Sequence, residues 1–121
     1  MTAKTKCIIV IDDEKDACDF IKSFLANRGY TVYVAFTGNE GFNLIRDKGP
    51  GLVLLDVKLP DINGIEVLAK LRKEDQVTKV VLMTGVESGE NIDRAEELKI
   101  TSVLNKPIKL LELDRIIKEE I

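Results

Sequence analysis

Histidine is missing from this chain of 121 residues, and cysteine is scarce. Without histidine there is no histidine-based acid–base catalysis and no histidine metal ligand. The two cysteines, Cys7 and Cys18, stand apart and form neither a metal-binding nor a redox motif. Two isolated thiols favour a reducing compartment, and we expect both to be small buried side chains. Any reactive or metal-binding site must therefore be built from other residue types.

Long apolar runs and basic clusters are also missing. No apolar stretch approaches the roughly 18 residues that a membrane-spanning helix requires. Residues 1–6 are too few and too polar to form a signal peptide. The net charge is −3, with lysine and arginine scattered along the chain. We therefore expect a cytoplasmic protein that binds neither nucleic acid nor a membrane directly.

The sequence does contain a regular alternation of short apolar runs and amphipathic segments. Five apolar runs predict strands: 8–11, 31–35, 52–55, 79–83 and 102–104. The run 52–55 is apolar at every position, as parallel strands buried on both faces must be. Helical spacing of apolar residues follows each strand. The sequence therefore predicts one α/β domain over residues 1–121, with a doubly wound five-stranded parallel sheet flanked by five helices.

The expected helices differ in how strongly the sequence marks them. Apolar residues at helical spacing define one face of the first helix: Ala17, Phe20, Ile21, Phe24 and Leu25. Thr37-Gly38-Asn39-Glu40 has the form of a capping box, which opens the second helix. The fourth helix is expected over residues 88–98 and has only a thin apolar face. We expect this helix to be the least firmly packed.

Four of the expected strands end on residues that can take part in phosphate chemistry: Asp12-Asp13, Asp56, Thr84 and Asn105-Lys106-Pro107. We adopt the flavodoxin-like strand order 2-1-3-4-5 because it brings these residues to one edge of the sheet, where such folds bind ligands. Three carboxylates crowded together repel one another, and a hard cation relieves the repulsion. Mg²⁺ suits an open site with few carboxylates, several waters and a phosphate oxygen.

The same residues could form an acyl phosphate, because a carboxylate can attack phosphorus. Such chemistry needs positioning and charge neutralisation, which Mg²⁺, Lys106 and the Thr84 hydroxyl would supply. Gly85 would allow close approach of the backbone, and a cis Lys106–Pro107 bond would help to aim the ammonium inward. Taken singly, each residue also has a plain structural explanation, such as a helix cap or a solvent-facing lysine. Only the combination predicts a site.

At these positions the chain resembles the receiver (CheY-like) domain of two-component response regulators. The resemblance covers essentially all of the chain and depends on four segments: Ile11-Asp12-Asp13-Glu14, residues 55–64, Met83-Thr84-Gly85 and Asn105-Lys106-Pro107. It implies a phosphorylation-dependent signalling switch in which Asp56 accepts a phosphoryl group. The donor would be a phosphohistidine on a histidine kinase or phosphotransfer protein. A conformational change would relay the signal to an output domain or target protein.

The resemblance also implies a division of labour within the site. Mg²⁺ would be bound by Asp13, Asp56 and the backbone carbonyl of Lys58, with Asp12 acting mainly through water. Thr84 and Lys106 would contact the phosphoryl group. Such a domain is not an ordinary enzyme, since it catalyses only its own phosphotransfer and autodephosphorylation.

Two residues depart from the usual pattern of this family. Val103 stands three residues before Lys106, where family members usually carry Tyr or Phe as a reporter of phosphorylation. Lys99 stands where glycine is common. The residues for phosphorylation are present, whereas the usual aromatic readout is not.

Three other interpretations remain open at this stage. A phosphohydrolase or phosphotransferase with an aspartyl nucleophile typically has a second acid two residues after the nucleophile, where this chain has Lys58. A flavodoxin-like cofactor binder would carry a loop rich in Gly, Ser or Thr after the first strand, where this chain has acidic residues. A degenerate receiver, used only for docking, would have lost Asp56, Thr84 or Lys106.

Overall fold

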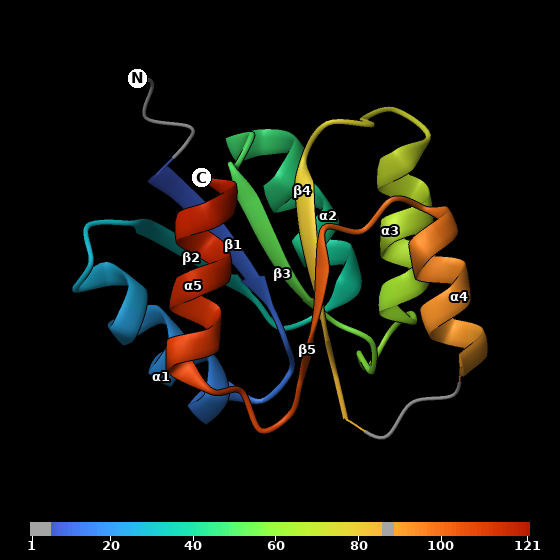
Figure 1. The fold of residues 1–121 in the computed structure, drawn as a ribbon. Helices are drawn as coiled ribbons and strands as arrows, with labels where there is room; N and C mark the ends of the chain where they lie inside the picture. The colour runs from blue at the N-terminus through green and yellow to red at the C-terminus, as the bar shows by residue number, and fades with distance from the viewer. Residues whose placement is uncertain (1–5, 86–88) are drawn as a thin grey trace.

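Five parallel strands form one sheet in the order β2-β1-β3-β4-β5 in a computed structural model that describes residues 6–85 and 89–121 (Figure 1). Strands and helices alternate along the chain: β1 (Cys7–Ile11), α1 (Lys15–Ala26), β2 (Thr31–Ala35), α2 (Gly38–Lys48), β3 (Leu52–Asp56), α3 (Gly64–Arg72), β4 (Lys79–Thr84), α4 (Gly89–Glu97), β5 (Ser102–Asn105) and α5 (Leu110–Glu120). The predicted fold class and strand order are confirmed. The start expected for the fourth helix, Ser88, lies outside the described residues.

Helices cover both faces of the sheet. α1 and α5 lie on one face, and α2, α3 and α4 lie on the other (Figure 1). Alternate residues of β1 therefore enter different cores: Ile9 and Ile11 pack with α2 and α3, while Ile8 and Val10 pack with α1 and α5. Every residue of β1 and β3 is buried, which explains why the runs that form them are apolar throughout.

The predicted capping box at the start of α2 is present in a shifted form. The Thr37 hydroxyl accepts the Glu40 backbone N–H at 3.1 Å, as expected of a capping residue. The Glu40 carboxylate accepts the backbone N–H of Phe36 at 2.8 Å, one residue earlier than in the usual box. The first contact satisfies an N–H group that the start of the helix leaves free, and the second satisfies the N–H group of the residue before the cap.

The predicted apolar face of α1 is wrong in one member. Phe20 is 59% exposed, and the buried residues of the helix are Cys18, Ile21 and Leu25. At about 100° per residue, Phe20 lies on the outward side of a stripe centred on these three. The expectation for the cysteines holds, because Cys7 and Cys18 are both buried and free.

Helix α4 contributes fewer fully buried side chains to the core than the central strands do. In α4 Ala95 is fully buried, while Ile92 and Leu98 beside it are only partly buried, in agreement with the thin apolar face expected there. None of the helices within residues 6–85 and 89–121 is long and apolar enough to cross a membrane.

Candidate functional site

The C-terminal ends of the strands meet at the lower edge of the sheet in Figure 1. Asp12 follows β1, Asp56 ends β3, and Thr84 ends β4 opposite Asn105 of β5. β1 and β3 are neighbours although they are not consecutive in the chain, so this edge includes the position where the strand order reverses. Three carboxylates, a hydroxyl and an ammonium thus reach one place from four strands.

Lys106 connects the acids of the two central strands. Its ammonium lies 2.9 Å from Oδ2 of Asp12 and 3.1 Å from Oδ2 of Asp56. The Glu14 carboxylate lies 3.5 Å from the same nitrogen. The Lys106–Pro107 bond is cis, the arrangement considered above as one that would help to aim the ammonium, and the Lys106 backbone N–H donates to the Thr84 carbonyl at 2.7 Å. The lysine is therefore fixed both through its backbone and through its ammonium.

The adjacent acids Asp12 and Asp13 have different surroundings. Asp12 is buried, and both of its oxygens are used, since Oδ1 accepts the Glu14 backbone N–H at 3.0 Å and Oδ2 contacts Lys106. Asp13 is exposed. Even so, one oxygen each from Asp12, Asp13 and Asp56 can be chosen so that all three lie within 4.8 Å of one another. Asp13 is therefore the acid with most freedom to take a new ligand.

The electrostatics of the cluster follow from two buried acids that share one cation. Burial raises the pKa of Asp56; the Lys106 hydrogen bond opposes that rise, and the nearby Asp12 carboxylate adds to it. Burial alone would lower the pKa of Lys106, but its hydrogen bonds to both acids outweigh that effect and raise it. A simple ion pair would lower the pKa of its acid. The opposite direction at Asp56 shows that burial, together with the Asp12 carboxylate, outweighs the stabilising effect of Lys106 on the ionised form.

The charge deficit can be counted. The three acids that could share a metal, Asp12, Asp13 and Asp56, carry three formal negative charges, and Lys106 offsets one, which leaves two uncompensated among them; the exposed Glu14 carboxylate adds a further negative charge nearby. A divalent cation would neutralise the two charges left among the three acids, and carboxylate oxygens are the ligands that Mg²⁺ prefers. The donor set thus fits a magnesium ion.

Thr84 supplies a second sign of an incomplete site. Its side chain is 3% exposed, and its hydroxyl has no hydrogen-bond partner within the part of the chain that the structure describes. Leaving a buried hydroxyl unpaired costs free energy, so such groups usually have a role outside the folded chain itself. A phosphoryl oxygen at this edge would supply the missing acceptor.

An open cleft of about 380 Å³ accompanies these groups. Its lining residues come from four loops: Asp13, Glu14, Asp56, Lys58, Gly85 and Lys106. A Cβ atom added at Gly85 would meet nothing within 4 Å among residues 6–85 and 89–121, so no close approach to this glycine is made within that part of the chain. A larger groove of about 490 Å³ adjoins the cleft on the α1 side, between Phe20 and the Pro107–Ile108 segment. The exposed ring of Phe20 lines that groove.

Several residues near the site escape prediction from the sequence. The Cys18 thiol donates to the Asp12 carbonyl at 3.2 Å, and burial together with the Asp12 charge raises its pKa to about 12, so it remains a thiol. Asp61 accepts two N–H groups from the start of α2. Helical spacing could have indicated Cys18, since it lies three residues before Ile21. No local signal pairs Asp61 with residues more than twenty positions earlier.

The two departures noted in the sequence have structural counterparts. Val103 is partly buried on β5 beside Leu82 and packs into the core shared with α3 and α4. Lys99 has φ of 63°, the left-handed conformation that glycine adopts most readily.

Comparison with known proteins identifies the family. The chain matches the response regulator receiver domain over residues 8–118. It belongs to this family. The receiver domain is the phosphoacceptor signalling module of two-component systems, and this chain has that fold and function. A receiver is a signalling domain rather than an ordinary enzyme, which separates the chain from the phosphohydrolase alternative.

Solved structures of receivers superpose closely on this chain. A CheY-like receiver domain protein from Methanospirillum hungatei JF-1 is 33% identical, with a TM-score of 0.89 over 94% of this chain and 91% of that one. The receiver domain of the Francisella response regulator 1452 is 29% identical, with a TM-score of 0.83 over 94% and 98%. NtrX from Brucella abortus is 27% identical, with a TM-score of 0.81, and the match covers 94% of this receiver but 27% of NtrX.

Proposed function

We propose that Asp56 is the phosphoacceptor of this receiver and that Lys106 and Thr84 hold the transferred group. The observation that carries the proposal is the Lys106 ammonium, which contacts Asp12 and Asp56 at the same ends of the strands where Thr84 ends β4 with a buried hydroxyl that has no partner among the described residues. An Asp56 oxygen attacks the phosphorus of a phosphohistidine, and the P–N bond breaks with its electron pair going to the imidazole. The products are an acyl phosphate on Asp56 and a free histidine on the donor.

The chain's own side chains then hold the product. Lys106 lies 3.1 Å from Asp56 and offsets part of the charge that the phosphoryl group brings. The Thr84 hydroxyl donates a hydrogen bond to a phosphoryl oxygen and thereby gains the partner it lacks. The movement of Thr84 toward the acyl phosphate is the first step of the conformational change.

Asp13, Asp56 and the backbone carbonyl of Lys58 are the groups that would hold Mg²⁺, and Asp12 would act mainly through water. The exposure of Asp13 and the double engagement of Asp12 support this division. When bound, the ion neutralises charge on the phosphoryl oxygens.

The partners are those that the receiver family implies. The donor is a histidine kinase or phosphotransfer protein, and an output domain or target protein senses the change; the setting is the cytoplasm, where neither membrane nor nucleic acid is contacted directly. Residues 1–121 act as one receiver unit, which also promotes loss of its own phosphoryl group.

The test is phosphorylation by a small acyl phosphate in the presence of Mg²⁺, followed by intact-mass measurement. Wild-type protein should gain one phosphoryl group, and Asp56→Asn should gain none. Asp47→Asn, an exposed acid of α2, is the matched control and should be labelled like wild type. Undiminished labelling of Asp56→Asn would overturn the assignment.

A further inference from the structure

The loop between β3 and α3 is closed at its base. The Gly64 backbone N–H donates to the Val57 carbonyl at 2.7 Å, so the first residue of the loop contacts the first residue of α3. A Cβ atom at Gly64 would come within 2.1 Å of the Asp56 carbonyl oxygen, which only glycine avoids. The Asn63 side chain caps α3 by accepting the Ile65 N–H at 2.7 Å. The end of the loop is therefore fixed directly against the phosphoacceptor strand.

The middle of the same loop is tied to a different element, the start of α2. The two carboxylate oxygens of Asp61 accept the backbone N–H groups of Gly38 at 2.7 Å and Asn39 at 2.9 Å. These are first-turn N–H groups, which have no partner within a helix. The hydrogen bond from Asn39, followed by that from Gly38, holds the pKa of Asp61 below its usual value, so the carboxylate remains ionised. Asp61 thus acts as a cap supplied from elsewhere in the chain.

Packing reinforces this junction. A Cβ atom at Gly38 would lie 2.6 Å from Cγ1 of Ile62 and 2.9 Å from Cγ2 of Val67. The absence of a side chain at Gly38 is what allows the loop to lie against the helix end. Ile62 and Leu59 are partly buried in the core on this face of the sheet.

We propose that Asp61 is a positioning residue that fixes the Lys58 backbone for the metal site. Lys58, Leu59 and Pro60 are the only residues between Val57, which is fixed at the base, and Asp61, which is fixed to α2. Pro60 further restricts this short segment. The Lys58 N–H contacts Oδ1 of Asp56 at 3.4 Å, and its carbonyl is the ligand assigned above. The inference rests on the proposed function, since it takes that carbonyl as a metal ligand.

Asp61 could instead serve only to stabilise α2, and Thr37 offers a matched control for that possibility. The Thr37 hydroxyl caps the same helix end through the Glu40 N–H at 3.1 Å and makes no hydrogen bond to the β3–α3 loop. Thr37→Ala should weaken α2 without releasing the loop. Asp61→Ala should weaken α2 and release the loop.

The experiment is calorimetric titration of Mg²⁺ into wild type, Asp61→Ala, Asp61→Asn and Thr37→Ala, with urea unfolding of each protein. We expect the Kd for Mg²⁺ to rise about tenfold in Asp61→Ala, the lower end of the cost of losing an outer-shell partner. Asp61→Asn keeps one oxygen acceptor and should fall between wild type and Asp61→Ala. Thr37→Ala should lose stability but keep its Kd within about twofold.

The outcomes separate the inference from the proposed function. If wild type binds Mg²⁺, Asp56→Asn binds it poorly and both Asp61 variants bind like wild type, the positioning role is wrong and the proposed site stands. An equal loss of affinity in Asp61→Ala and Thr37→Ala would also overturn the positioning role. If wild type does not bind Mg²⁺, the proposed site and the inference fall together. Asp61→Asn keeps the test decisive should Asp61→Ala fail to fold.

Discussion

Two cationic side chains, Lys106 and Arg72, lie partly or fully buried at opposite ends of the parallel strands. They have different kinds of partner. Lys106 contacts the side-chain carboxylates of Asp12 and Asp56. Arg72 is 7% exposed and donates to backbone carbonyls only, at four positions: Leu98 at 2.9 Å, Asp75 at 3.0 Å, Thr78 at 2.9 Å and Lys99 at 3.1 Å. One cation is held by carboxylates that can also accept a phosphoryl group, and the other is held by carbonyls of the turns that it joins.

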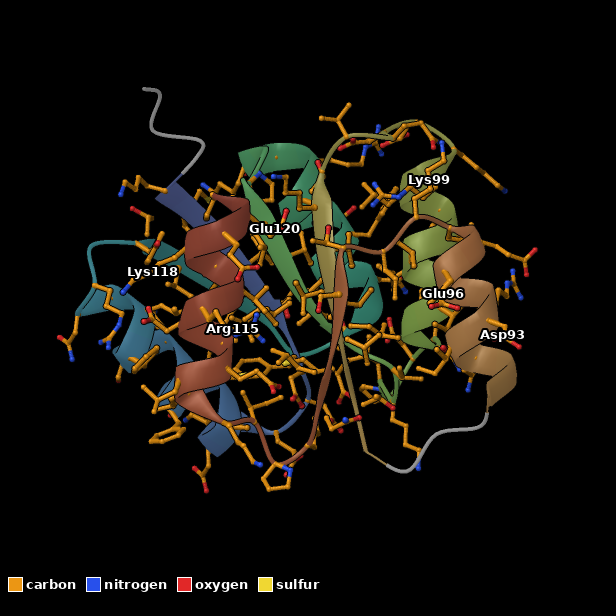
Figure 2. All side chains as sticks on the ribbon, viewed as in Figure 1. Asp93, Glu96, Lys99, Arg115, Lys118 and Glu120 are labelled. Atoms are coloured by element: carbon orange, nitrogen blue, oxygen red, sulfur yellow. The ribbon has the colours of Figure 1, made fainter. Side chains whose placement is uncertain are left out.

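The difference distinguishes a binding site, at Lys106, from a structural contact between elements, at Arg72. Carboxylates can exchange an ammonium for a metal or accept a phosphoryl group, so the Lys106 contacts can be rearranged by a ligand. Backbone carbonyls change partner only if the chain itself moves. Arg72 joins the end of α3, the turn that follows it and the end of α4, and it therefore fixes α4 at the end remote from the site. Figure 2 shows Lys99 at that remote end, with Asp93 and Glu96 along α4.

The largest expected effect on stability comes from removing the Arg72 side chain. Arg72→Ala removes the donor from four partly buried carbonyl contacts and also removes a buried side chain, so it should lower the free energy of unfolding by about 3 kcal/mol. Lys73→Ala, at the exposed neighbouring position, is the control and should change it by less than about 0.5 kcal/mol. Urea unfolding of the three proteins gives both values. A loss below about 1 kcal/mol for Arg72→Ala would mean that water replaces the arginine easily.

Lys106→Met tests the other half of the comparison. It should lower the rate of phosphoryl uptake at Asp56 by about 100-fold, the cost of removing one preorganised donor. It should also destabilise the domain without metal, because Asp12 and Asp56 then lie together without a cation. Added Mg²⁺ should narrow the stability gap to wild type, since the ion restores the missing charge.

Arg72→Ala is the control for that rescue. Mg²⁺ stabilises any folded receiver that binds it, so both wild type and Arg72→Ala should gain stability by the same amount and their difference should stay constant. If Mg²⁺ closed the gap for Arg72→Ala as fully as for Lys106→Met, the distinction between an exchangeable and a structural cation would fail. Urea unfolding with and without Mg²⁺ gives the stability difference from wild type for Lys106→Met and for Arg72→Ala under each condition.

Sequence reasoning succeeds where the determining signal is local or repeated along the chain. The strands follow from apolar runs, and the residues at their ends, such as Asp56 and Thr84, follow from where those runs stop. The strand order came from asking which order gathers the polar residues, and the structure has that order.

What the sequence does not reveal are contacts between distant positions. Arg72 reads as an ordinary helical surface residue, and its acceptors 26 and 27 positions later are backbone groups, which carry no residue signature. Asp61 meets α2 across 22 and 23 positions for the same reason. Phe20 fits a helical face by spacing, yet which side of α1 turns inward depends on where the sheet lies.

The dependence of stability on pH should also distinguish the surroundings of the two cations, because Lys106 contacts the titratable acid Asp56 whereas Arg72 donates to backbone carbonyls. Burial, with a contribution from Asp12, raises the pKa of Asp56 above its ordinary value of 3.8, so the native state holds this proton where the unfolded chain has lost it. The stabilisation is fully present below 3.8 and is lost as pH rises through the native pKa. Asp56→Asn should therefore become progressively more stable than wild type as pH rises from that value.

Over the same range the deficit of Arg72→Ala should change little. Its hydrogen-bond partners are carbonyls, which do not titrate. Burial alone would raise the pKa of the nearby Asp75, but hydrogen bonds from Thr78 and Val77 hold it below its ordinary value, so this acid is ionised over most of the range. Urea unfolding in steps across the range compares the two variants. An Asp56→Asn advantage that did not grow with pH would show that burial of the ionised carboxylate costs nothing here.

The smallest expected effect concerns Lys99, whose carbonyl Arg72 holds. Its φ of 63° costs an ordinary L-residue about 1 kcal/mol, which glycine avoids. The Ile100 N–H donates back to the Ala95 carbonyl at 3.4 Å, so this is the position after a helix end at which glycine is favoured. Lys99→Gly should raise the free energy of unfolding by up to about 1 kcal/mol, and Lys99→Ala, which keeps Cβ, should not. In the Arg72→Ala background the gain should shrink, because without the guanidinium the helix end can relax out of the left-handed conformation. Full additivity in this double-mutant cycle would mean that the turn, and not Arg72, fixes Lys99.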